Sequence, residues 1–204
     1  MTTSREQGRR GFGASTRWLP GAGLVVVLAL GFAACGKAPQ TASTPAAPAM
    51  SPVERGQYLV TTAGCNDCHT PFQLGPQGPE PDMSRMLSGH PQGLVMPEPP
   101  VLPPGPWAWV GAGTMTAFAG PFGVSFSANI TPDMATGIGS WTEEVFIQTL
   151  RSGKHLGTGR QILPPMPWMW VGKMTDEDLK AVYAYLKSIP PIANEVPQPI
   201  PPKS

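Results

Sequence analysis

The sequence predicts a small all-α domain, and three observations support this prediction. Segments that begin near residues 51, 142 and 175 each combine a capping residue with apolar positions at helical spacing. No segment shows the alternation of apolar and polar residues that is typical of a strand. Only 13% of the residues are charged, while 27 Pro and 24 Gly predict long irregular stretches. We place the domain at residues 51–190, with an irregular insertion at 71–128 and a Pro-rich C-terminal tail at 191–204.

The first 35 residues have the pattern of an export signal peptide. Four arginines precede an apolar run, Gly21 to Ala34, which is too short and too rich in Gly for a membrane span. The run ends in Phe-Ala-Ala-Cys, which resembles a bacterial lipobox, so we expect a lipid anchor on Cys35. The alternative is cleavage after an Ala, which leaves Cys35 an ordinary residue. Residues 36–50 are typical of a flexible linker. We therefore expect a protein of the periplasm or cell envelope, anchored to the membrane.

The charge balance excludes one class of partner. The whole chain carries a net charge of +1 with His neutral. Beyond Cys35, ten basic residues stand against twelve acidic ones, which leaves a net charge of −2. Nucleic-acid binding requires a basic stripe, so we expect no nucleic-acid partner.

Each predicted helix has its own start and stop signals. Ser51 can cap the first helix, and Glu54 completes a capping box before an end near Gly64. Thr142 can cap the second helix, which has two Glu in its first turn and can end at Gly153. The third helix follows Thr175 and stops before two prolines. Its apolar stripe has the spacing i, i+3, i+4 and i+7: Leu179, Val182, Tyr183 and Leu186.

Cys65-Asn-Asp-Cys68-His69 is the attachment pattern of c-type haem. Two thiols three residues apart on a helical turn reach both vinyl groups of one porphyrin, and the next residue places an imidazole under the iron. The same two cysteines are also compatible with a redox disulfide or half of a zinc site. Zinc needs further paired Cys or His, and a thioredoxin-like disulfide needs strands, and we find neither. We predict one covalent haem c, with His69 ligating the iron and donating its other ring nitrogen to a backbone carbonyl.

The segment after this motif is unusually rich in Pro. Residues 71–107 contain eleven Pro and almost no helical period. Loops of this length are uncommon in compact domains unless they are functional or disordered. We expect an irregular wrap over one haem edge, or alternatively a docking surface for a redox partner. Four aromatic residues follow and can pack on the haem or form an apolar patch for a partner: Trp107, Trp109, Phe118 and Phe122.

Three stretches resemble the class I cytochrome c family, and most closely the cytochrome subunits of bacterial periplasmic alcohol and aldehyde dehydrogenases. They are residues 54–70 (ERGQYLVTTAGCNDCHT), 129–153 (NITPDMATGIGSWTEEVFIQTLRSG) and 164–192 (PPMPWMWVGKMTDEDLKAVYAYLKSIPPI). The resemblance implies an all-α class I cytochrome c fold around one haem, with the first and last helices crossing over one haem edge. It also implies an axial Met at Met166. The chain departs from those subunits in having one haem motif rather than several, and a longer Pro-rich segment.

The residues themselves leave three methionines between the second and third helices. Met174 precedes a helix cap and Met169 lies between two Trp, and both settings suit packing. Met166 lies among three prolines that fix the loop, and it matches the Pro-Met-Pro loop of the family. We therefore predict Met166 as the second iron ligand, with His155 as the alternative and His90 less favoured. Candidate donors to the haem propionates are Arg151, Lys154, His155, Arg160, Trp141 and the backbone of 129–139.

Two functions fit these residues. A haem with both axial positions filled carries single electrons, whereas an open or labile sixth position suits a haem enzyme or gas sensor such as a peroxidase. The sequence offers no distal acid–base pair for peroxide chemistry. We predict an electron-transfer protein rather than an enzyme, which exchanges electrons with redox partner proteins such as a periplasmic dehydrogenase or a respiratory complex.

The lipid anchor is tested by replacing Cys35. We predict that the mature wild-type protein partitions into detergent and that Cys35→Ser moves it to the aqueous phase, because the variant lacks the acyl chains. Mass spectrometry of the mature N-terminus should find a lipidated Cys35. An unmodified residue other than Cys35 at that end would contradict the assignment.

Overall fold

The computed structural model describes residues 50–203. The signal peptide predicted at 1–35, with Cys35, and residues 36–49 of the predicted linker lie outside the described residues. The elements follow in the order α1 (Pro52–Thr62), α2 (Cys65–His69), β1 (Phe72–Gly75), β2 (Gly78–Pro81), η1 (Met83–Arg85), β3 (Val110–Gly111), β4 (Ala117–Gly120), β5 (Gly123–Phe126), α3 (Glu143–Ser152), η2 (His155–Gly157), α4 (Trp168–Val171) and α5 (Asp176–Ser188). Within this range, no helix has the length and apolar character needed to cross a bilayer.

The three helices expected from the sequence are confirmed. Ser51 caps α1 in a capping box with Glu54, and the helix ends at Ala63. Thr142 caps α3 by accepting from a backbone N–H one turn along, and Gly153 ends it. Thr175 caps α5 in the same way as Thr142. These helices form where expected because their caps and apolar stripes are local features.

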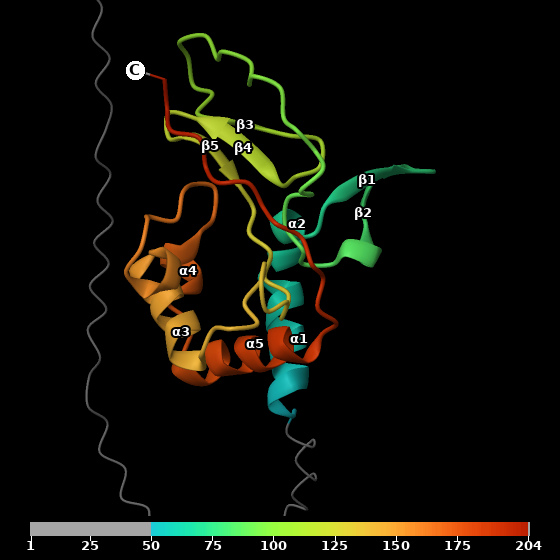
Figure 1. The fold of residues 1–204 in the computed structure, drawn as a ribbon, viewed down its shortest axis with the longest axis vertical. Coiled ribbons are helices and arrows are strands. Elements are labelled where there is room, and N and C mark those ends of the chain that lie inside the picture. The colour runs from blue at the N-terminus through green and yellow to red at the C-terminus, as the bar shows by residue number, and fades with distance from the viewer. Residues whose placement is uncertain (1–49, 204) are drawn as a thin grey trace, which may run out of the picture. The chain divides into compact units, whose positions relative to one another are not determined.

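The prediction of an all-α fold is wrong. Strands β1 and β2 form an antiparallel hairpin, and β3, β4 and β5 form a second antiparallel sheet in that order. Both sheets lie inside the insertion at 71–128, and the β1–β2 hairpin projects away from the helices (Figure 1). The pattern was missed because the strands have at most four residues, too few for alternation to stand out from the surrounding sequence. Most β1–β2 residues are exposed, whereas Ala117 and Phe118 are both buried although they point to opposite faces.

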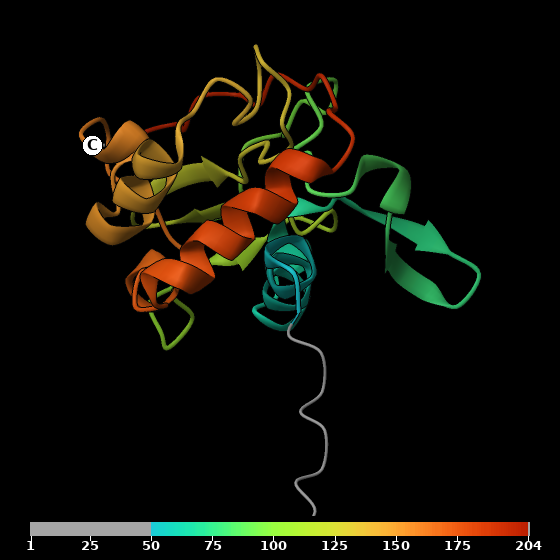
Figure 2. The same cartoon turned by 90° about the horizontal axis from the view of Figure 1, so that it is seen from below.

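The hydrophobic core lies between α1, α3 and α5 (Figures 1 and 2). Two loop residues complete it, Leu87 from the insertion and Ile138 from the segment before α3, and both are fully buried. The buried cluster consists of Val60, Leu87, Ile138, Phe146, Leu150, Leu179, Val182, Leu186 and Ile189. The insertion therefore contributes to the same core as the helices.

Helices α1 and α5 cross in close contact (Figure 2). A Cβ atom added at Gly56 would lie 1.9 Å from the carbonyl oxygen of Ala181, so only Gly permits this approach. An ion pair of 2.8 Å between Arg55 and Asp178 spans the crossing nearby. Position 56 thus controls how closely the two helices pack.

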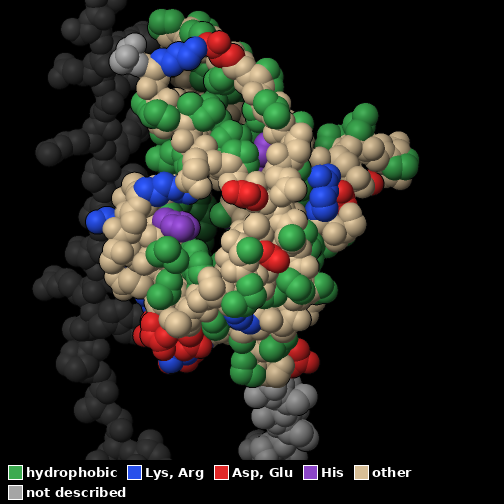
Figure 3. All heavy atoms as spheres, viewed as in Figure 1, with side chains coloured by type: hydrophobic (Ala, Val, Ile, Leu, Met, Phe, Trp, Pro, Cys, Tyr) green, Lys and Arg blue, Asp and Glu red, His purple; other side chains and the backbone are tan. Residues whose placement is uncertain are grey.

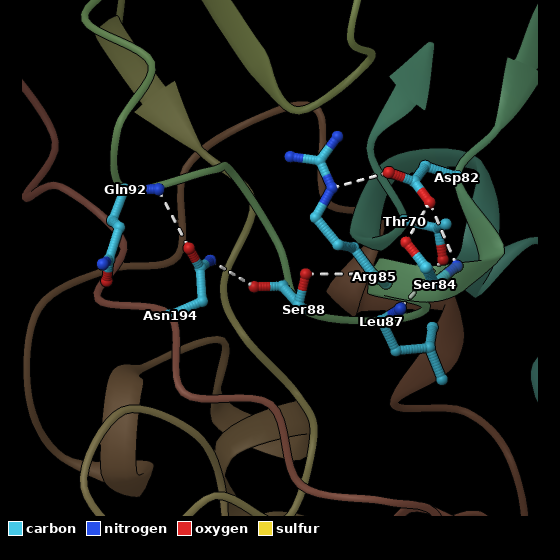
Figure 4. A network of polar contacts seen from close by, with 8 residues as sticks. All are labelled: Thr70, Asp82, Ser84, Arg85, Leu87, Ser88, Gln92 and Asn194. Carbon is cyan, nitrogen blue, oxygen red and sulfur yellow. Dashed lines mark hydrogen bonds and ion pairs between the residues drawn. The ribbon is translucent and has the colours of Figure 1, made fainter.

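Residues 191–203, expected as a Pro-rich tail, run back along the insertion (Figure 1). The Asn194 side chain donates to the carbonyl of Ser88 (2.7 Å) and accepts from the backbone N–H of Gln92 (2.9 Å) (Figure 4). It also donates to the carbonyl of His90 (2.9 Å). Further along, Ile200 forms an isolated antiparallel bridge with Val124 of β5. The tail therefore connects residues 88–92 of the insertion and the second sheet to the end of the chain.

The close crossing gives a stability prediction for Gly56→Ala. Helix propensity alone favours Ala over Gly by about 1 kcal/mol. The contact with Ala181 outweighs this, so we expect the free energy of unfolding to fall by about 1–3 kcal/mol in chemical denaturation of the holoprotein. Gly93→Ala is the matched control, since nothing lies within 4 Å of a Cβ at that position. Equal unfolding midpoints for the two variants would contradict the packing argument.

Candidate haem-binding site

The Cys65–His69 motif forms the single turn of α2, directly after α1. Its conformation is held by the hydroxyl of Thr70, which donates to the Asn66 side chain (2.8 Å) and accepts from the backbone N–H of Leu87 (2.9 Å). Figure 4 shows Thr70 beside Leu87. Since Leu87 is fully buried in the core, this pair fastens the short helix to the domain.

The imidazole of His69 is oriented by a hydrogen bond of 2.8 Å from Nδ1 to the carbonyl oxygen of Ala128. A carbonyl only accepts, so Nδ1 carries the proton and Nε2 presents a lone pair. This confirms the expected bond to a backbone carbonyl. Nε2 makes no hydrogen bond within residues 50–203. Because every buried polar side-chain atom in that range has a hydrogen-bond partner, Nε2 is not one of the buried atoms and is accessible.

The electrostatic surroundings keep His69 neutral. Burial lowers its pKa, and the bond to Ala128 opposes that shift without reversing its direction. The residue as a whole nevertheless keeps part of its surface accessible, so protein surrounds the ring without closing over it. A neutral imidazole with an accessible Nε2 is the form that ligates a metal.

The two thiols of the motif are free and partly buried. Burial raises the pKa of Cys65 to about 11, and burial followed by the nearby Asp67 carboxylate raises that of Cys68. Both thiols are therefore protonated at neutral pH, unlike a redox-active pair, whose attacking Cys has a lowered pKa. Residues 50–203 also contain no group of three or more His, Cys, Asp or Glu side chains that could hold a metal ion.

Met166 lies at the edge of the core that also contacts Cys65. Its side chain is partly buried against this core, whereas Met169 is 52% exposed on α4. Met174 also packs against the core and precedes the cap of α5. The hydroxyl of Ser125 on β5 donates to the carbonyl of Pro164, two residues before Met166, at 2.7 Å. Burial thus separates Met166 from Met169, and the sheet contacts the loop that carries Met166.

The candidate propionate donors differ in whether their side chains already have partners within the protein. Arg151 is engaged with Asp176 (2.6 Å) and with the carbonyl of Gly172. In contrast, the rings of Trp141 and His155 lie 5.5 Å apart, and His155 donates its backbone N–H to the carbonyl of Arg160. Arg160 forms no ion pair within residues 50–203, and partial burial lowers its pKa. Lys154 likewise forms no ion pair within residues 50–203, so the available donors are Trp141, Lys154, His155 and Arg160.

His90 is excluded as an iron ligand by its contacts. It is fully buried, and its two ring nitrogens are engaged by Thr116 Oγ1 and the carbonyl of Leu94, both at 3.0 Å. Its ring also lies 4.9 Å from that of Phe126. His90 thus links Leu94 to Thr116 within the insertion and is not free to ligate a metal.

The residues present fit a c-type haem. The donor set combines two unbridged thiols, a neutral imidazole with an accessible nitrogen, and a partly buried thioether on the same core. Figure 3 shows a hollow in this face of the molecule with apolar side chains on its walls. Two other cavities, of about 560 Å³ beside Arg55 and about 520 Å³ beside Arg85, lack thiols and imidazoles in their linings, so we do not place the cofactor there.

Sequence reasoning missed two contributors to the site, Ala128 and Ser125. Ala128 acts through its carbonyl, which every residue has, so no residue type identifies it in advance. Ser125 belongs to a strand that has no sequence pattern of its own. Both were assigned to the irregular insertion.

Comparison with known proteins finds that the chain is similar to cytochrome subunits of bacterial dehydrogenases. It is 31% identical over 150 residues to the fructose dehydrogenase cytochrome subunit of Gluconobacter japonicus, covering 74% of this chain and 24% of the relative. It is 28% identical to the gluconate 2-dehydrogenase cytochrome c subunit of Pantoea cypripedii, covering 72% of this chain and 27% of the relative. The cytochrome c subunit of Gluconobacter oxydans alcohol dehydrogenase (quinone) is also 28% identical, with 69% and 22% covered. No family model matches the chain. The chain thus spans about a quarter of the length of these curated relatives.

Proposed function

We propose that this chain, a homologue of the cytochrome c subunits of bacterial dehydrogenases, is an exported monohaem c-type cytochrome that carries single electrons. The observation that supports this best is the orientation of His69. Its Nδ1 donates to Ala128 while Nε2 stays accessible, one residue after a pair of free thiols. Haem, when bound, supplies the one-electron chemistry of its iron.

Each residue of the site has a separate task in this proposal. Cys65 and Cys68 would hold the haem through thioether bonds, and His69 and Met166 would ligate its iron. A thioether opposite a histidine favours the reduced state and raises the reduction potential relative to two histidines. A filled sixth position also excludes small molecules, which suits a carrier rather than an enzyme or gas sensor.

The proposed partner is the catalytic subunit of a periplasmic dehydrogenase, with a respiratory complex as acceptor. The relatives are named as subunits of fructose, gluconate and alcohol dehydrogenases, which supports a partner of this kind. A lipid on Cys35 would keep the protein at the membrane, where such complexes pass on electrons.

Covalent attachment is tested with acidified acetone. We expect the haem to stay on the polypeptide, at one haem per chain, because thioether bonds survive denaturation. The double variant Cys65→Ser/Cys68→Ser should lose it, whereas Cys35→Ser should keep it and serves as the control. Haem that the solvent extracts from the wild type would overturn the central assignment.

The sixth ligand is tested through the oxidised spectrum. The wild type should show the weak red absorption of a sulfur–iron bond. Met166→Ala should lose that band, bind carbon monoxide when reduced, and have a lower reduction potential. Met169→Ala should keep the band, because Met169 is exposed. The reverse outcome would reassign the ligand, and carbon monoxide binding by the wild type would favour an open sixth position.

A further inference from the structure

The segment 125–128 is hydrogen-bonded both to helix α2, which carries His69, and to the loop that carries Met166. At one end, the hydroxyl of Ser125 donates to the carbonyl of Pro164 at 2.7 Å. At the other, the carbonyl of Ala128 accepts from Nδ1 of His69 at 2.8 Å. Four residues, two at the end of β5 and the two that follow it, therefore connect the two sides of the proposed iron site.

The loop that carries Met166 makes few hydrogen bonds with the rest of the protein. Pro164 and Pro165 have no backbone N–H, so they cannot donate hydrogen bonds. Within residues 50–203, the bond from Ser125 is the only side-chain hydrogen bond made to residues 163–166, whose backbone also forms a turn at Pro164 and Pro165. The backbone bonds of the flanking residues lie outside the loop, from Ile162 to Gly153 and from Trp170 to Pro167.

Strand β5, which carries Ser125, is held by contacts on both of its edges. Ser125 is 7% exposed and lies opposite Phe118 in the β4–β5 pairing. On the other edge of β5, Val124 and Ile200 exchange two backbone hydrogen bonds, of 2.8 and 2.9 Å. A Cβ at Gly123, where φ is +89°, would lie 2.0 Å from the Ile200 carbonyl oxygen, so the C-terminal segment presses directly on the strand. The backbone that carries Ser125 is therefore held by neighbours on both sides.

We propose that Ser125 is a positioning residue that keeps the sulfur of Met166 directed at the haem iron. This inference rests on the proposed function, in which Met166 is the sixth ligand. Met has three rotatable side-chain bonds, so its sulfur stays in place only if the backbone that carries it is fixed. Removing the hydrogen bond between Ser125 and Pro164 should raise the fraction of molecules in which Met166 is off the iron by on the order of tenfold. This is the effect of one ordinary hydrogen bond.

The test is the affinity of the oxidised holoprotein for imidazole, which binds only when the sixth position is free. The apparent dissociation constant is inversely proportional to the population of the open state. We therefore expect Ser125→Ala to bind imidazole on the order of tenfold more tightly than the wild type. Ser188→Ala is the matched control, since its hydroxyl donates to the Tyr185 carbonyl at 2.8 Å near the end of α5, and it should leave the affinity unchanged.

Two further comparisons separate positioning from general loosening of the fold. Ser125→Thr and Ser125→Val have similar shapes, but only Thr keeps a hydroxyl, so Thr should bind imidazole more weakly than Val. In a Met166→Ala background the sixth position is always open, so adding Ser125→Ala should change the affinity no further. The proposal would be overturned if Ser125→Ala raised the imidazole affinity equally in the wild type and in Met166→Ala. It would also be overturned if Ser125→Thr and Ser125→Val bound imidazole equally tightly.

The outcomes also distinguish this inference from the proposed function. If Met166→Ala leaves both the red absorption band and the imidazole affinity unchanged, Met166 is not the ligand and the proposed function itself is wrong in that part. If Met166→Ala removes the band while Ser125→Ala leaves the imidazole affinity unchanged, the ligand assignment stands and the role of Ser125 is refuted.

Discussion

The hydrogen bond between His69 and the Ala128 carbonyl is the constraint on which the rest of the site depends. It joins residues 59 positions apart and decides that Nδ1 carries the proton. It thereby also sets the direction in which the lone pair of Nε2 points. Helix α2 has only five residues, and helices this short are not stable alone. The motif therefore takes its shape from contacts outside it, which come from Thr70, the segment 87–89 and Ala128.

The insertion is consequently part of the architecture of the site. Leu87 belongs to the core, Gly89 donates its N–H to the His69 carbonyl, and Ser125 holds the loop of Met166. The C-terminal segment completes the arrangement, since Asn129 donates to Ile192 and Asn194 satisfies two carbonyls of the insertion. Buried carbonyls without partners are costly, so these amide side chains hold together segments that have little regular structure of their own.

The groups proposed to hold the haem and to ligate its iron are uncharged at neutral pH. The thiols have raised pKa values, the pKa of His69 is lowered, and a thioether does not titrate. Burying neutral donors costs far less than burying charged ones, so the chain can form this surface with few ion pairs. Negative charge enters only with the haem propionates, and Arg160, without a carboxylate partner in the described part of the chain, suits that role.

The sequence by itself determined the three main helices, their capping residues and the Cys65–His69 motif. All of these depend on residues within a few positions of one another, so a single local pattern identifies each. It also indicated that His69 would donate to a backbone carbonyl, but not which one. Only the tertiary structure decided that the carbonyl is that of Ala128, that Ser125 contacts the Met166 loop, and that the insertion contains two sheets. Strands of four residues and contacts through backbone carbonyls have no signature of their own, because their stability comes from partners distant in the chain.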